Sequence, residues 1–412
     1  MKTIIRSFAA ALLASVAVTG APAIAKDPPK ADAPKAPKLS KAYTTALVAA
    51  QKQMAAGDNA GALVTLNGLD AVPPTADDDA YLTLSMKLNA AIGLKDNVMT
   101  EQMLSKMLAT GKVPAADQPK FYKNVGAMAL QRKDYNAATI AFEQLVKLTP
   151  GDGESQVALA ELYQAQKQTG KAIATLNAAM AGQKAAGQPV PEAWYRRALA
   201  IAYDAKLVDQ IQPAAVALVG AYPNAVNWRD ALVITRDSYK LDDQGSLDFM
   251  RLQAVTNSLN GERDFVEYAD TALGKGFPGE AQFAINEGVK KNMLVASKPL
   301  VAELKKSADS KVAADKASLP GLERDAKANP KLALATGDAY YGYGEYAKAA
   351  ALYKQAVGAP TVDQATANLR LGMALARSGD KAGATAALNA VKGGPRETLA
   401  KYWLVFIGQP TA

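Results

Sequence analysis

The chain has 412 residues, a formal net charge of +8, and neither cysteine nor histidine. Apolar residues make up 49% of it, so a chain of this length can bury a continuous core without disulfides. The two missing residue types exclude Ser-His-Asp and Cys-His catalytic arrangements, as well as zinc sites built on histidine or cysteine.

Residues 1–25 have the pattern of a secretory signal peptide. Lys2 and Arg6 form a basic start, an apolar run follows, and Ala23 and Ala25 frame a small-x-small cleavage site. The run is too short for a comfortable membrane span, although a retained anchor is the alternative. No cysteine follows that could carry a lipid. We therefore expect a periplasmic or secreted protein, with no membrane span after signal cleavage.

Residues 26–41 are rich in proline, lysine and alanine and show no apolar period. This composition predicts a solvated tether. Its lysines offer an alternative role, attachment to an anionic envelope surface.

The regular part of the chain begins with an N-terminal array at 42–190, and residues 118–152 are its clearest stretch. They read as two amphipathic helices, the second of which ends at Pro150. Gly126 and Ala138 leave gaps where the helices can approach closely, and Phe142 fills the space beside the contact. One such hairpin cannot bury its apolar face alone, so copies must stack on it.

Copies are visible along the chain. A large second-helix residue recurs at intervals of 38 residues, as Leu66, Leu104 and Phe142. Near the other end a small residue is paired with a large one, and the pair recurs 35 residues later: Gly337 with Tyr353, then Gly372 with Leu388.

The stretch 118–152 resembles a tetratricopeptide repeat. The residues that carry the resemblance are Tyr122, Val125, Gly126, Ala138, Phe142 and Pro150. Ala129 departs from the pattern, because a tyrosine is expected there. The resemblance implies an all-α solenoid of about eight to nine stacked hairpins, and a broad role in binding another macromolecule.

The rest of the chain divides into a degenerate middle segment, 191–329, and C-terminal repeats, 330–412. Within the middle segment, 296–329 has the length of one repeat but few of its marks, and its Lys/Ala/Asp content predicts exposed helices. A last helix, 396–407, is expected to cap the final apolar face.

Asp77, Asp78 and Asp79 invite a calcium interpretation, but they lack the spacing of a calcium-binding loop. They stand directly before a predicted helix, whose N-terminus favours carboxylates. We expect them to cap that helix.

The sequence contains no P-loop, no GxSxG motif and no HExxH motif. An enzyme that uses only carboxylates or a Ser-Lys dyad remains formally possible. We expect no catalytic activity, no cofactor and no metal.

The resemblance also implies where a partner binds: on the inner surface, lined by the first helix of each hairpin. The candidate residues on that face are Gln51, Asn89, Lys120, Lys123, Trp194, Arg197, Lys331, Asp338 and Tyr341. An exposed tryptophan beside an arginine is typical of a binding hot spot. The alternative is a Trp194 packed beneath the loop 187–191. Among the neighbouring tyrosines, Tyr340 and Tyr346 are expected in the core.

Some tetratricopeptide domains clamp the carboxylate at the end of a partner. Lys123 and Asn124 offer a fragment of that clamp, but Ala127 stands where it needs an asparagine.

Three functions therefore remain open. The first is a non-catalytic scaffold that binds a protein or peptide, in cell-envelope assembly or transport. The second is a binding module for an anionic glycan or cell-wall polymer, and the third is an enzyme of the carboxylate-only type. A structural array that only self-associates is a further alternative. Without Lys2 and Arg6 the net charge is only +6, which does not indicate nucleic acid as a partner.

Overall fold

The computed structural model describes residues 37–409, and the regular elements among these residues are all helices. The contacts separate two compact units, one ending at Ala186 and the other beginning at Gly187. The predicted signal peptide, 1–25, and the tether up to residue 36 lie outside the described residues. Between 37 and 409, no helix has both the length and the hydrophobicity that crossing a membrane requires.

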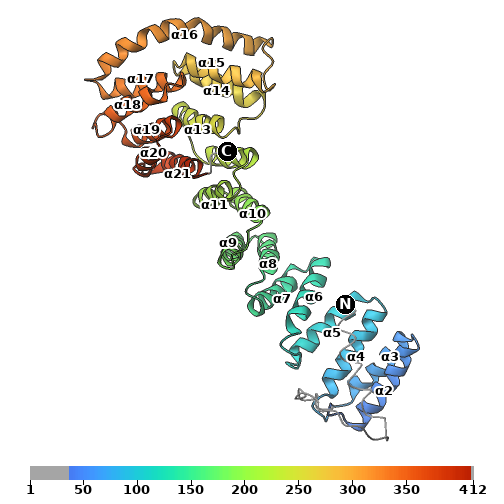
Figure 1. Cartoon of the computed structure of the whole chain (residues 1–412). Coiled ribbons are helices and arrows are strands. Elements are labelled where there is room, and N and C mark those ends of the chain that lie inside the picture. The colour runs from blue at the N-terminus through green and yellow to red at the C-terminus, as the bar shows by residue number, and fades with distance from the viewer. Residues whose placement is uncertain (1–36, 410–412) are drawn as a thin grey trace, which may run out of the picture. The chain divides into compact units, whose positions relative to one another are not determined.

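Residues 37–186 form four helical hairpins, and each helix packs against the next one along the chain (Figure 1, blue to green). These helices are α2 (Lys41–Ala55), α3 (Asn59–Asn67), α4 (Asp79–Gly93), α5 (Asn97–Ala109), α6 (Gln118–Gln131), α7 (Tyr135–Leu148), α8 (Gly153–Ala165) and α9 (Thr169–Ala185). A short 3-10 turn, η2 (Gly68–Ala71), follows α3.

The second unit continues with the same kind of helix. Its helices are α10 (Glu192–Asp204), α11 (Val208–Ala221), α12 (Ala225–Asp237), α13 (Asp243–Val255), α14 (Glu262–Gly274), α15 (Pro278–Lys290), α16 (Pro299–Ala326), α17 (Pro330–Gly342), α18 (Tyr346–Ala356), α19 (Gln364–Ser378), α20 (Lys381–Asn389) and α21 (Gly394–Gly408). The expected all-α architecture is confirmed. Helix α16 differs from the expected helices at 296–329, because it runs unbroken for 28 residues.

Close helix contacts follow the small and large residues that the sequence pairs. A Cβ added to Gly126 would lie 2.6 Å from Cε2 of Phe142, so only glycine fits there. The C-terminal copies show the same contact, with added Cβ atoms at 2.6 Å and 2.5 Å in the pairs Gly337 with Tyr353 and Gly372 with Leu388. The predicted hairpin pattern is therefore confirmed at both ends of the chain.

Aspartates begin the second helices of the first three hairpins. The side chains of Asp58, Asp96 and Asp134 each accept a hydrogen bond from the backbone N–H three residues on. Each bond satisfies one of the amides that a helix N-terminus leaves without a partner. The 38-residue spacing of these aspartates is thus a spacing of helix starts.

Asp78 and Asp79 have a different role from the predicted one. Neither caps α4; instead their carboxylates accept backbone N–H groups from the preceding chain, including Lys38 at 2.9 Å from Asp78 and Ser40 at 2.9 Å from Asp79. Asp79 also accepts from Thr75 and Ala76. Burial alone would raise the pKa of Asp79, but these amides lower it. The end of the predicted tether is therefore fixed to the first unit.

Helix α21 closes the second unit. Besides packing against its neighbours α19 and α20, it contacts α11 and α13 (Figure 1, red and yellow-green). The hydroxyl of Tyr402 lies 2.6 Å from Thr235 Oγ1 on α12, and the Tyr402 and Trp228 rings pack at 6.0 Å. The predicted capping helix thus covers the last hairpin and also joins it to the start of the same unit.

Candidate functional site

The predicted binding residues of the first unit lie on the first helices of its hairpins. Gln51 on α2 and Asn89 on α4 are half-buried, whereas Lys120 and Lys123 on α6 are exposed. These positions leave the predicted inner surface accessible. Whether it binds a partner stays a prediction.

The expectation of an exposed Trp194 is wrong. Its side chain is only 5% exposed, because the large apolar ring lies inside the unit at the start of α10. The loop 187–191 is held in place as well: Val190 is buried, and its carbonyl accepts a hydrogen bond of 2.6 Å from the Tyr222 hydroxyl. Arg197 on the same helix is half-buried. Trp194 is therefore a core residue.

Asp338 and Tyr341 were also expected on an exposed surface and are instead buried, at 2% and 7% exposure. Asp338 belongs to a buried cluster of charged side chains in the second unit, and the Tyr341 ring packs against Arg251 of the same cluster. No sequence pattern indicated this charged cluster, which consists of Asp248, Arg251, Glu280, Asp338 and Arg370.

Arg251 on α13 is the centre of the charged cluster. Its guanidinium donates from Nε and Nη2 to the two oxygens of Glu280 on α15, both at 2.8 Å. Its Nη1 donates to Asp248 at 3.0 Å, and Asp338 lies 3.4 Å away. The two-pronged geometry matches the planar guanidinium to the carboxylate and fixes its orientation.

A second arginine completes the charged cluster. Arg370 on α19 donates to the remaining oxygen of Asp338 at 2.6 Å, and the Tyr353 hydroxyl donates to the same carboxylate at 2.8 Å. Buried charges are tolerated only when they are paired in this way, so the charged cluster ties α13, α15, α17 and α19 together.

The pKa values within the charged cluster reflect this pairing. Burial alone would lower the pKa of Arg251, but the Glu280, Asp338 and Asp248 carboxylates raise it well above its ordinary value. Burial raises the pKa of Tyr268, whose hydroxyl donates to Glu280 at 2.8 Å, and the Glu280 charge raises it further. Arg251 stays charged and Tyr268 stays neutral at any physiological pH.

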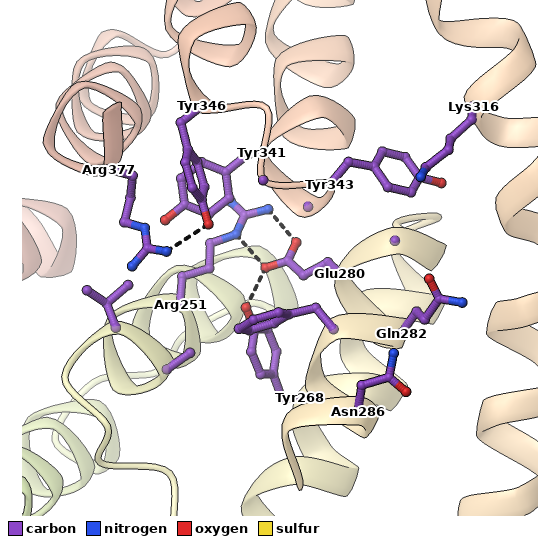
Figure 2. A pocket seen from close by; sticks show the side chains of 16 residues that line it. Arg251, Tyr268, Glu280, Gln282, Asn286, Lys316, Tyr341, Tyr343, Tyr346 and Arg377 are labelled. Atoms are coloured by element: carbon purple, nitrogen blue, oxygen red, sulfur yellow. Dashed lines mark hydrogen bonds and ion pairs between the residues drawn. The ribbon is translucent and has the colours of Figure 1, made fainter. Parts of the chain in front are cut away.

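An open pocket of about 330 Å³ lies directly beside the charged cluster, and we call it the tyrosine pocket (Figure 2). The residues that define it are Arg251, Tyr268, Asn286, Lys316, Tyr341, Tyr343, Tyr346 and Arg377. Helices α13 to α19 all contribute to its wall, as does the loop between α17 and α18. Its volume is at the lower end of the range for ligand sites.

Each of three tyrosine rings in the pocket already carries a cation on one face. The guanidinium of Arg251 lies 4.9 Å from the ring centre of Tyr341. At the rim, Arg377 lies 4.7 Å from the ring of Tyr346 and Lys316 lies 4.7 Å from that of Tyr343. Such contacts are favourable, and they hold long side chains in place.

The two rim cations differ from Arg251 in their pairing. Arg377 donates to the Tyr346 hydroxyl at 2.9 Å, but within residues 37–409 neither it nor Lys316 forms an ion pair with a carboxylate. Both side chains are exposed. The nearby Asp315 accepts the hydroxyl of Tyr343 at 2.6 Å. The rim therefore presents two positive charges that form no ion pair with the described part of the chain.

Two glycines allow the pocket wall to form. A Cβ on Gly279, at the start of α15, would lie 2.3 Å from the Tyr343 ring, and one on Gly342 would lie 2.9 Å from Cβ of Glu280. Helix α15 and the end of α17 can touch only because both positions lack a side chain. The same contact brings Glu280 to Arg251.

The tyrosine positions were predicted only in part. Tyr340 is buried at 3% exposure, as expected. Tyr346 was expected in the core and is half-buried instead, because its ring packs edge-on against Tyr341 at 5.1 Å, beneath Arg377. No metal site accompanies the pocket: the described residues hold no group of three or more acidic side chains that could bind an ion.

Comparison with models of protein families and with curated proteins found no match. Among solved structures, the chain is similar to MamA from Desulfovibrio magneticus, with 16% identity over 49% of this chain and 100% of that one, at a TM-score of 0.28. A tetratricopeptide repeat protein from Parabacteroides merdae shares 11% sequence identity over 65% of this chain and 99% of its own, at a TM-score of 0.29. PilF of Pseudomonas aeruginosa shares 14% sequence identity over 67% of this chain and 90% of its own, at a TM-score of 0.21.

The architecture follows from the helix packing itself. That packing consists of stacked helical hairpins with a glycine facing a large residue at the repeated contact. Over the described residues the chain is a helical repeat protein built from stacked hairpins.

Proposed function

We propose that the chain is a non-catalytic scaffold that binds a protein or peptide partner, and that it works in the periplasm after export through residues 1–25. The observation that carries the proposal is the tyrosine pocket. It is open to solvent, its wall is held by the buried charged cluster, and its rim offers exposed cations and aromatic rings. Tyrosine and arginine are the residue types that dominate the energy of protein interfaces.

The wall of the pocket supports binding for a second reason. Arg251 and Tyr341 are buried and fixed by several neighbours, so a partner would not have to order them. Binding sites that are already formed lose less conformational entropy on association. In the first unit, Lys120 and Lys123 are exposed on the surface where the sequence predicts a partner to bind.

Site-specific crosslinking tests the scaffold proposal. Phe283 lines the tyrosine pocket and is 42% exposed, whereas Val295 is 52% exposed in the same unit and does not line the pocket. A photo-reactive phenylalanine analogue is placed at one position or the other, and each protein is irradiated in an envelope extract. We expect one distinct protein to be crosslinked from position 283 and not from 295.

The captured protein must then bind the purified whole chain in solution, measured by calorimetry. If both positions capture the same background proteins, or the purified pair does not associate, the scaffold proposal is wrong. The export proposal has its own measurement, the N-terminal residue of the protein recovered from cells. We expect Lys26 at that position.

A further inference from the structure

The tyrosine pocket carries an inference about the chemistry of its occupant, and this inference rests on the proposed scaffold function. The charges of the pocket and its rim divide into two sets. Arg251 is compensated by three buried carboxylates, so it adds no net attraction for a ligand. Arg377 and Lys316 are exposed and, among residues 37–409, pair only with tyrosines.

A cationic occupant does not fit this arrangement. Three of the tyrosine rings that line the pocket each carry one of the cations Arg251, Lys316 and Arg377 on a face. A further positive charge would be repelled by these side chains at short range. An anion would instead complete the pairing of both rim cations, and the arginine fork is suited to a carboxylate.

The positions of the two rim cations point to an extended occupant. In Figure 2, Arg377 and Lys316 lie at opposite ends of the row formed by Tyr346, Tyr341 and Tyr343. A single small anion would reach one cation only. A peptide with acidic side chains along its length can reach both, while the exposed amide of Asn286 on the pocket wall is available for its backbone.

An acidic sugar polymer would also be extended and anionic, but the rings argue against it. Sugar rings bind proteins largely by lying flat on aromatic faces, and here each of three tyrosines already holds a cation on a face. We propose that the tyrosine pocket binds an acidic, extended peptide segment of the partner, with Arg377 and Lys316 each pairing with a carboxylate.

Fluorescence anisotropy with labelled peptides tests this proposal on the whole chain. The probe is a short fluorescein-labelled peptide of alternating alanine and glutamate, compared with the same peptide carrying glutamine or lysine in place of glutamate. We expect the glutamate peptide to bind at least about tenfold more tightly than either of the others. Its affinity should fall as salt is raised from about 50 to about 300 mM, because the rim cations are exposed.

Two double variants locate the binding. Arg377→Gln with Lys316→Gln removes both rim cations, and Arg263→Gln with Lys311→Gln removes two exposed cations that do not line the pocket. The pairs lower the net charge equally, and all four side chains are exposed, so folding should be preserved. We expect the first pair to weaken glutamate-peptide binding at least about tenfold and the second pair to leave it within about twofold.

Several outcomes would overturn the proposal. Equal loss in both double variants would mean attraction to overall charge, and equal binding of the glutamine peptide would mean that carboxylates are not recognised. A galacturonic acid oligomer that binds more tightly than the peptide, and loses affinity only in the Arg377→Gln/Lys316→Gln variant, would assign the pocket to an anionic glycan.

The two proposals can fail separately. Capture of a protein from position 283, together with no binding of the acidic peptide, would leave the scaffold standing and remove the acidic segment. Binding of the acidic peptide, together with no captured protein, would leave the preference of the pocket for acidic peptides standing and remove the protein scaffold.

Discussion

Gly279 is the residue on which the tyrosine pocket depends most directly. Its missing side chain lets the Tyr343 ring lie against the start of α15, and a Cβ there would approach ring atoms to 2.3 Å. Tyr343 cannot easily move aside, since its hydroxyl is bound to Asp315 and its ring lies under Lys316. We expect Gly279→Ala to lower the free energy of unfolding by about 1–3 kcal/mol and to weaken glutamate-peptide binding.

A matched control separates this contact from the general effect of alanine in a helix. Gly220 also lies in a helix of the second unit, and nothing lies within 4 Å of an added Cβ there. Gly220→Ala should raise the free energy of unfolding by about 0.5–1 kcal/mol. The measurement is urea unfolding followed by tryptophan fluorescence. The steric explanation is refuted if the two substitutions change stability in the same direction.

At the scale of helices, the sequence predicted the hairpins well because their signal is local. Gly126 and Phe142 are 16 residues apart, so a repeated pattern in one stretch of chain reveals their contact. The tyrosine pocket has no such signal. Arg251 meets Glu280 and Asp338 across 29 and 87 residues, and nothing in the sequence near Asp338 distinguishes a buried aspartate from an exposed one.

Two helices likewise show features that the local sequence does not predict. The sequence of α16 contains Pro320 and Gly321, which usually end a helix, yet α16 continues through both. Helix α21 was predicted as a cap from its aromatic content, but its contact with α11 and α13 depends on how all the intervening helices stack. Contacts that arise from the accumulated geometry of many repeats cannot be predicted from any one of them.

The return contact of α21 yields a prediction about that helix. Thr235 is 1% exposed, and its hydroxyl has Tyr402 as its partner. Tyr402→Phe leaves the threonine hydroxyl buried without a hydrogen bond, so we expect it to cost about 1–3 kcal/mol of unfolding free energy. Thr235→Val should cost a similar amount, since it leaves the tyrosine hydroxyl without its closest partner.

The double variant Tyr402→Phe/Thr235→Val should be less damaging than the sum of the two single changes, because neither side chain then carries an unsatisfied polar group. The cycle is measured by urea unfolding. Strict additivity of the two changes would show that the hydrogen bond does not stabilise the return contact of α21.

At the scale of the whole molecule, the positions of the tryptophans determine which unit a fluorescence measurement reports on. The chain has three tryptophans, and Trp194, Trp228 and Trp403 all belong to the unit that begins at Gly187. Tryptophan fluorescence of the whole chain therefore reports unfolding of the second unit without any need to cut the chain.

The second unit should lose stability in alkali. Burial raises the pKa of six of its tyrosines above the ordinary value: Tyr268, Tyr340, Tyr341, Tyr343, Tyr353 and Tyr402. In the unfolded chain these hydroxyls ionise near pH 10, whereas in the folded unit they stay neutral to higher pH. The contribution of the neutral tyrosines to the free energy of unfolding is therefore fully present below about pH 10. It is lost as the pH rises towards the pKa values of these tyrosines in the folded unit.

We expect the urea midpoint from tryptophan fluorescence to be constant between about pH 8 and 9 and to fall steadily between about pH 10 and 11.5. Tyr402→Phe provides the control. This variant starts less stable but has one buried ionisable hydroxyl fewer, so its midpoint should fall less steeply above pH 10 than that of the unaltered protein. A flat midpoint up to pH 11.5, or an equally steep fall in the variant, would show that the buried tyrosines do not couple folding to proton release.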